Sequence, residues 1–178
     1  MTWRRSALRW LPTFLGFPLG GFAAELIAGP VDGLAPALVA GAVTGVILGG
    51  VQSWAIGPHG PPAHQWLAAT TTGLSLGLAV GSAAVGYGTD LADLVVQGAI
   101  CGLAIGIAQA IVLRGRAAYL WAPALSALWA LGWAVTTAIG IDVETQYAVF
   151  GSSGALVVTV ATATLPALLS TRAPRSAS

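Results

Sequence analysis

The chain carries very little charge. Of its 178 residues only 7% are charged, and none is lysine, so all seven basic residues are arginine. A soluble globular domain carries about a quarter charged residues, because its surface must be solvated. A charge content this low excludes an ordinary water-soluble domain and indicates a surface that faces lipid. The net charge of +1 also gives no electrostatic reason to bind nucleic acid.

Cysteine and catalytic motifs are equally scarce. Cys101 is the single cysteine, so no intrachain disulfide can form. The sequence has no His-Glu-x-x-His motif and no Ser/His/Asp set. His59 and His64 stand in a Pro/Gly-rich loop without neighbouring cysteines or carboxylates, which is a poor set of metal ligands. We therefore expect a protein that is not an enzyme and that holds no metal or cofactor.

Hydrophobic residues, by contrast, make up 56% of the chain and fall into six long runs. A bilayer core needs about 20 mostly apolar residues per helix, which each run supplies. The runs show no alternation and are about twice as long as a barrel strand, so strands are a poor alternative. The sequence predicts one all-α transmembrane domain over 1–178, with helices at about 10–29, 33–56, 66–87, 90–113, 117–139 and 146–169.

The arginines define the orientation. With six spans, every arginine falls on one side of the membrane, and the acidic residues of the loops fall on the other. The positive-inside rule places the arginine side in the cytoplasm, so both termini are predicted to be cytoplasmic. Abundant alanine and glycine with no lysine or asparagine are typical of a GC-rich bacterial genome, so we expect a multi-pass protein of a bacterial inner membrane. The arginines are Arg4, Arg5, Arg9, Arg114, Arg116, Arg172 and Arg175.

An internal repeat runs through the six spans. Each odd-numbered run opens with tryptophan, and each even-numbered run carries small residues at every fourth position. Such a glycine zipper forms a flat stripe that lets a neighbouring backbone approach closely. The pattern predicts three tandem helical hairpins, at about 10–56, 66–113 and 121–169, around a pseudo-threefold axis normal to the membrane. Its members are Trp10, Gly41, Gly45, Gly49 and Gln52; then Trp66, Gly98, Gly102, Gly106 and Gln109; then Trp121, Gly151, Ala155, Thr159 and Thr162.

Two packing arrangements of these stripes are compatible with the sequence. In the first, the even-numbered helices form an inner ring around the axis. In the second, each stripe joins an even-numbered helix to the odd-numbered helix of its own hairpin. The spacing of the glycines does not distinguish the two.

The repeat also carries a resemblance. A glycine stripe that ends in glutamine, an arginine-bearing turn and a tryptophan that opens the next span resemble uncharacterised bacterial multi-helix membrane proteins with glycine-zipper and glutamine repeats. The resemblance covers most of the chain and implies an all-helical membrane fold, but it brings no activity with it. The third copy departs from the pattern, since Thr162 replaces the glutamine.

The polar residues that end the stripes are candidates for a ligand site. Gln52, Gln109 and Thr162 occupy matching positions near the cytoplasmic ends of their helices. A buried amide needs a partner, so we expect interhelical hydrogen bonds first. The alternative is a polar ring that binds a head group, a solute or a cofactor.

Glu25 is the one acidic residue inside a predicted span. By the tryptophan register its counterparts are Ser82 and Thr137, so all three copies are polar there. Ionisable groups inside a membrane are costly and often functional, which makes Glu25 a candidate proton or cation site. Because it lies near the outer end of its helix, we expect its carboxylate to reach the interface instead.

Two further sets complete the candidates. Asp32, Asp90 and Asp142 begin the even-numbered helices, where capping is the expected role and an outer acidic ring that concentrates cations is the alternative. Trp129 and Trp133 lie one turn apart in the fifth run. We expect them to fill the space opposite glycines, and the alternative is a pocket for a flat or polyene ligand.

These observations favour a non-enzymatic membrane protein. We expect a scaffold or accessory subunit that packs against a membrane-protein partner or a second copy, or a binder of a lipid-like or pigment ligand. The alternative is a small transporter or channel for a cation or small solute along the pseudo-threefold axis. The two differ in whether Gln52, Gln109 and Glu25 face a hydrated axis or are satisfied locally.

Overall fold

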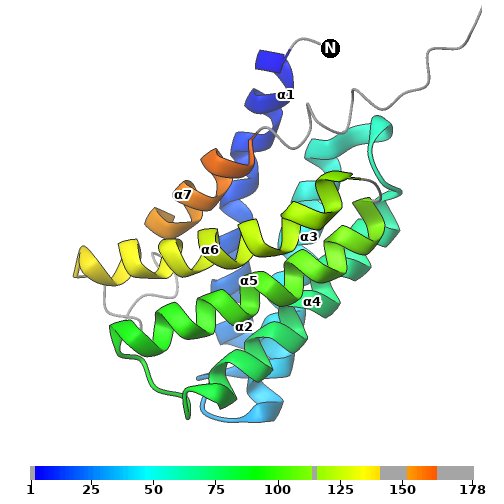
Figure 1. Ribbon diagram of the computed structural model, residues 1–178. Helices are drawn as coiled ribbons and strands as arrows, with labels where there is room; N and C mark the ends of the chain where they lie inside the picture. Colours follow the sequence, from blue (N-terminus) through cyan, green and yellow to red (C-terminus); the bar gives the residue numbers. More distant parts are fainter. Residues whose placement is uncertain (1–2, 114–115, 141–151, 164–178) are drawn as a thin grey trace, which may run out of the picture.

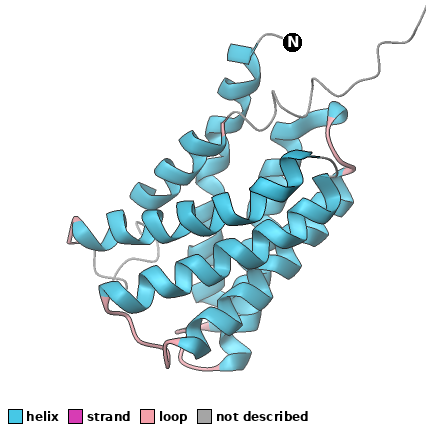
Figure 2. Cartoon of the chain, viewed as in Figure 1, coloured by secondary structure: helices cyan, strands magenta, loops and turns pink. Residues whose placement is uncertain are grey.

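The computed structural model describes residues 3–113, 116–140 and 152–163. Within these ranges the chain is helical and contains no strand (Figure 2). Five of the helices are long and apolar enough to cross a membrane. The protein is therefore an all-α, multi-pass membrane protein in the part that the structure describes.

The first membrane-crossing segment is one rod made of three pieces. α1 (Trp3–Trp10) continues into the 3-10 helix η1 (Leu11–Leu15) and then into α2 (Gly16–Ala28). Pro12 lies at the start of η1 and has no backbone N–H, so the regular α-helical hydrogen-bond ladder is interrupted there. The apolar stretch Ala7–Ala28 spans all three pieces.

The following helices lie close to their predicted positions. The predicted third run at 66–87 ends three residues early, at Ala84, because Gly86 and Tyr87 adopt positive φ of 60° and 63° and turn the chain out of the helix. The sixth run, predicted at 146–169, is described only in α7; its remainder lies outside the described residues. The elements are α3 (Leu34–Ile56), η2 (Gly57–His59), α4 (Ala63–Ala84), α5 (Leu91–Leu113), α6 (Arg116–Ala138) and α7 (Ser152–Thr162).

The helices pack in the order of the chain. Each of α2 to α6 contacts the helix that follows it, and α7 contacts both α6 and the 3-10 helix η1 near the start (Figure 1). The described end of the chain thus returns to its beginning. As a result, the inward faces of all six segments surround a common interior.

The glycine stripe of α3 is the site of its closest helix contact. A Cβ built at Gly45 would lie 2.6 Å from Cα of Thr71 in α4, and one built at Gly41 would lie 2.6 Å from Cα of Ser75. The α3 and α4 backbones therefore touch at these positions. Both arrangements considered from the sequence are wrong here, because the stripe joins α3 to the helix that follows it.

The stripe of α5 makes the equivalent contact with α6. A Cβ at Gly106 would lie 2.5 Å from Cα of Ala122, and Gly102 lies against the carbonyl of Leu125. The glycines of α4 contact α5 in turn, since a Cβ at Gly73 would lie 2.7 Å from Cα of Ile105. Close backbone contact between consecutive helices therefore recurs from α3 to α6.

Apolar side chains lie on the surface of the bundle and polar side chains lie inside it, the reverse of a soluble protein. Leu26, Ile111 and Leu120 are 71–73% exposed, whereas Thr70 and Gln109 are 0% and 1% exposed. In water this arrangement would leave large apolar side chains solvated and would desolvate amides and hydroxyls. In lipid it is favourable, because the polar groups meet each other inside the bundle.

Candidate functional site

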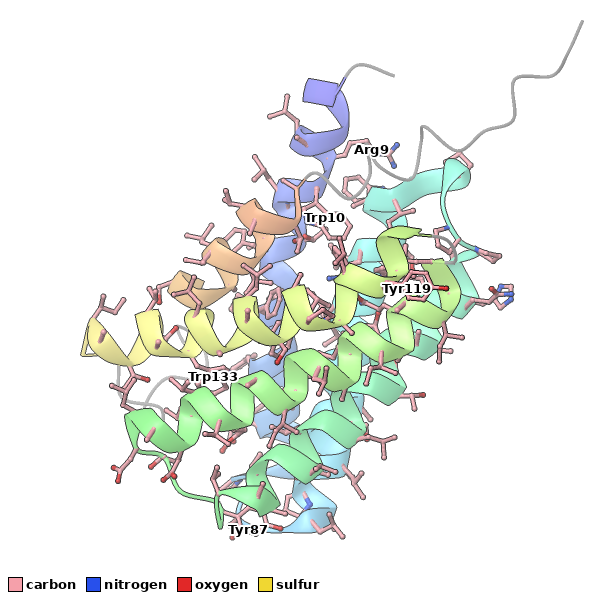
Figure 3. The ribbon with its side chains drawn as sticks, in the orientation of Figure 1. Arg9, Trp10, Tyr87, Tyr119 and Trp133 are labelled. Atoms are coloured by element: carbon pink, nitrogen blue, oxygen red, sulfur yellow. The ribbon has the colours of Figure 1, made fainter. Side chains whose placement is uncertain are left out.

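Trp10 lies at the end of the bundle near Arg9 (Figure 3), and Trp66 and Trp121 belong to the same cluster of packed side chains. Trp66 Nε1 donates to Oε1 of Gln52 at 3.0 Å, and Trp121 Nε1 donates to Oε1 of Gln109 at 2.9 Å. The third indole, Trp10 Nε1, donates to Oγ1 of Thr162 at 2.9 Å. Each tryptophan thus bonds the polar residue that ends a stripe on a neighbouring helix. We call these six residues with Thr70 the indole–amide layer.

The layer is internally satisfied. Gln109 Nε2 donates to Oγ1 of Thr70 at 2.9 Å and makes a longer contact of 3.4 Å with Oε1 of Gln52. Thr70 Oγ1 donates to the carbonyl of Trp66, and Thr162 Oγ1 donates to the carbonyl of Val158 at 2.7 Å. Buried amides and hydroxyls with partners of this kind hold neighbouring helices in one arrangement.

The sequence anticipated part of this layer. Gln52 and Gln109 do approach each other, as a polar ring requires, and both are satisfied within the protein. Thr162 bonds Trp10 and not a glutamine, so the three polar residues are linked through indoles. Thr70 was missed, although its place one turn after Trp66 on a helix that faces the interior is a signal that sequence could supply.

A cavity of about 580 Å³ occupies the opposite half of the bundle. Its walls come from α2 to α7, and the loops at Gly29 and at Tyr87 border it at the end away from the indole–amide layer. Leu74 lines the cavity and packs with Ile105 and Leu125, which contact Trp121 of the layer. The interior is thus hollow toward one end and packed toward the other.

Polar side chains from five helices line the cavity, including Thr44 of α3. Glu25 of α2, Gln97 of α5 and Thr136 of α6 lie in its wall together with Ser82 of α4. Ser82 is 2% exposed, and its hydroxyl has no hydrogen-bond partner. Thr136 Oγ1 lies 3.2 Å from Oγ of Ser153 in α7. The Ser82 oxygen is itself buried, so it lies behind the surface of the wall and a molecule in the cavity does not reach it without a local movement.

Aromatic rings form another part of the wall. The Phe17 and Trp129 rings lie 5.6 Å apart at an interplanar angle of 51°, and Trp133 lies one turn further along α6. Both tryptophans also contact glycines of α5: the Trp133 ring lies against Gly98, and Cβ of Trp129 lies against Gly102. The two roles considered for these tryptophans therefore coincide, because side chains that cover the stripe also face the cavity.

Tyr87 borders the cavity at the end of the bundle opposite Trp10 (Figure 3). Its φ of 63° is unusual for a residue with a side chain, and its backbone N–H donates to the carbonyl of Ser82 at 2.8 Å. This tight turn after α4 brings Tyr87 to the border of the cavity. No motif in the sequence identifies such a turn as part of a site.

Of the three positions that the tryptophan register makes equivalent, Glu25, Ser82 and Thr137, two line the cavity. Glu25 and Ser82 both line the cavity, as their equivalent depths suggest. Thr137 does not, and its hydroxyl donates to the carbonyl of Trp133 at 3.0 Å. The preceding residue, Thr136, takes the place in the wall. A shift of one residue rotates a helical side chain by about 100°, which accounts for the difference.

The three aspartates that precede even-numbered helices do not behave alike. Asp32 borders the cavity, but the N-cap of α3 is Gly33 and no side chain caps that helix, so the expected capping role of Asp32 is wrong. Asp90 is exposed and is not part of the wall. Asp142 lies outside the described residues. An outer ring of three carboxylates therefore has one described member at the cavity.

The charges near the cavity share one sign. The charged residues in its wall are Glu25 and Asp32. The one arginine side chain that the structure describes, Arg9, lies at the other end, where it donates to the carbonyl of Trp54 at 2.7 Å and stacks 5.4 Å from that indole. The cavity therefore presents a negative electrostatic environment.

Metal-binding geometry is absent from the described ranges. No group of three or more His, Cys, Asp or Glu side chains converges there. Cys101 is buried and unpaired in the cavity wall, and His64 is exposed at the start of α4. The arrangement offers hydrogen bonding, aromatic contact and one intramembrane carboxylate, which suits non-covalent binding.

Gln97 and Phe17 are wall residues that sequence reasoning missed. Gln97 is 8% exposed and directly precedes Gly98, so an amide at the start of a stripe was the available signal. Phe17 is one apolar residue among many in its span, and sequence offers no sign of its direction.

No protein-family model, no curated protein and no solved structure matches the chain, and its family is not assigned.

Proposed function

We propose that this protein is a membrane-embedded binding protein for a small, largely apolar molecule. The molecule would enter from the end of the bundle that carries the loops at Gly29 and Tyr87. The observation that carries the proposal is a cavity of about 580 Å³ that is lined by six helices and bordered by the loops at Gly29 and Tyr87. Ligand pockets have volumes of about 300–1,000 Å³ and combine apolar walls with a few polar groups. Phe17, Trp129 and Gln97 supply both kinds of contact.

The threefold repeat belongs to the same proposal. We infer six spans, with α7 as the described part of the sixth, arranged as three hairpins around an axis that runs through the layer and the cavity. The three indole bonds support this arrangement, because each joins an odd-numbered segment to the end of an even-numbered stripe. The last of them, from Trp10 to Thr162, closes the ring.

Orientation follows from the arginines. With the arginine side in the cytoplasm of a bacterium, the indole–amide layer lies at the cytoplasmic end and the cavity opens outward. A ligand would then arrive from the outer leaflet or from the space outside. The protein would hold it as an accessory subunit, alone or with a membrane-protein partner.

Retention of a native ligand tests the function. The protein is purified in mild detergent and its small-molecule content is measured by mass spectrometry. Leu78 lines the cavity and Leu76 is exposed on the same helix, so Leu78→Trp and Leu76→Trp form a matched pair. We expect wild type and Leu76→Trp to retain the same molecule and Leu78→Trp to lose it. A molecule retained equally by both variants, or none in wild type, contradicts the proposal.

A second function is favoured by the position of the layer. It separates the cavity from the arginine end, so an outward-open cavity with an inner barrier is also the geometry of a transporter in one of its states. Transport would require the bond between Gln109 and Thr70 to break during each cycle. Flux of the retained molecule across reconstituted vesicles, lost in Leu78→Trp, would establish transport; binding without flux would exclude it.

A further inference from the structure

We propose that the ligand is a lipophilic organic cation, an amine or quaternary ammonium attached to an apolar body, and that Glu25 supplies its counter-charge. This inference rests on the proposed binding function and specifies the class of molecule that the cavity takes. Two observations carry it: the sign of the charges in the wall and the aromatic rings beside them.

Glu25 contributes a carboxyl group to the cavity wall. Its carboxyl group belongs to α2, inside the apolar stretch Ala7–Ala28, and it lines the cavity. A carboxylate in such surroundings is stabilised by a nearby positive charge. No described basic residue lies in the cavity wall, and Arg9 is engaged with Trp54 at the opposite end. A cationic ligand would supply the positive charge that the described wall lacks.

The aromatic residues suit the same charge. Trp129, Trp133 and Tyr87 line the cavity, and Phe17 packs against Trp129. The faces of aromatic rings attract cations, most strongly when the cation is desolvated, and tryptophan is the best of them. An ammonium group beside indoles and a carboxylate gains from both, while an aromatic or aliphatic body fills the remaining apolar wall.

The same features argue against two other ligands. An inorganic cation such as calcium needs six to eight oxygen ligands at close range, whereas this wall is mostly apolar. A phospholipid would bring its phosphate toward Glu25 and Asp32, which repel it. The Gln97 amide in the wall can hydrogen-bond an amine or a polar substituent. A monovalent organic cation satisfies all of these groups together.

Three probes of nearly the same shape and different charge test this inference. They are benzyltrimethylammonium, its neutral isostere neopentylbenzene, and the anion benzylsulfonate. Each is titrated onto the full chain in nanodiscs of neutral lipid, with binding measured by saturation-transfer NMR. The signal from Leu78→Trp, whose larger side chain occupies part of the cavity, is subtracted from that of Leu76→Trp to remove partition into lipid.

We expect the cation to bind about tenfold more tightly than the neutral isostere and the anion to bind least. Glu25→Gln should abolish this preference and leave neopentylbenzene binding unchanged, whereas Glu25→Asp, which keeps the charge, should retain it. Far-UV circular dichroism of each variant checks its fold, and the three-probe comparison in wild type needs no variant.

The outcomes separate the two proposals. If neopentylbenzene binds as tightly as the cation, or if the preference survives Glu25→Gln, the cation inference is wrong and the binding function stands. If none of the probes gives a signal that Leu78→Trp removes, both proposals are overturned.

Discussion

Replacing Gly45 by alanine adds a single methyl group at the point where α3 and α4 touch. That Cβ would lie 2.6 Å from Cα of Thr71, a backbone atom that no change of rotamer can move. Carbon atoms prefer separations of about 3.5–4.0 Å, so the two helices must move apart by about 1 Å. The contacts along the rest of the stripe, including that of Gly41 with Ser75, weaken as a consequence.

The size of the effect follows from a matched position in the same helix. A Cβ at Gly50 meets nothing within 4 Å, so Gly50→Ala changes only helix propensity, which favours alanine by about 1 kcal/mol. Gly45→Ala gains the same propensity but incurs an overpacking cost of typically 1–3 kcal/mol. We expect Gly50→Ala to be slightly more stable than wild type and Gly45→Ala to fall below Gly50→Ala by that overpacking cost.

The assay is equilibrium unfolding in mixed micelles with an increasing fraction of dodecyl sulfate, followed by far-UV circular dichroism. The free energy of unfolding of each variant is compared with that of wild type in the same detergent. If Gly45→Ala is as stable as Gly50→Ala, the α3 and α4 backbones are not in contact at Gly45. Close packing of α3 on α4 along the glycine stripe would then be refuted.

Three further predictions concern the layer and the orientation. Gln109→Leu deprives two members of the indole–amide layer of their partner, so we expect a loss of about 1–3 kcal/mol in the same unfolding assay, and an unchanged midpoint would contradict the hydrogen bonds. Trp10→Phe removes the bond from the start of the chain to α7, so we expect faster protease cleavage after α6 than in wild type; equal rates would exclude a role for this bond in holding α7. In a Cys101→Ala background, an impermeant maleimide added outside should label Thr89→Cys and not His64→Cys, both exposed positions, and the reverse pattern would overturn the orientation.

The candidate residues show how far local pattern reaches. The sequence placed Gln52 and Gln109 at matching depths, and the structure links them. It also placed Glu25 and Ser82 at equivalent depths, and both line the cavity. Depth along a helix follows from the constant rise per residue, so it can be counted in the sequence. Direction around the helix is less certain, and Thr137, one residue from the cavity-lining Thr136, illustrates the error.

The sequence did not determine which helix packs against each glycine stripe. The glycine stripe of α3 was compatible with an inner ring or with a contact inside its own hairpin, and it packs on α4 instead. Any small-residue stripe can accept any neighbouring backbone, so its spacing does not identify the helix that fills it. The same limit applies to the turn at Gly86 and Tyr87, whose positive φ brings Tyr87 to the cavity rim.

By itself the sequence determined that the chain is helical, lies in a membrane and has its long spans close to where the structure places them. Those properties depend on the hydropathy and length of each local segment, because lipid requires every backbone polar group to be satisfied within a helix. Only the tertiary structure decided that Trp10 bonds Thr162, 152 residues away, and that a cavity with Glu25 and Trp129 in its wall lies beyond the layer. Those features depend on which helix faces meet, and that is set by the packing of all segments together.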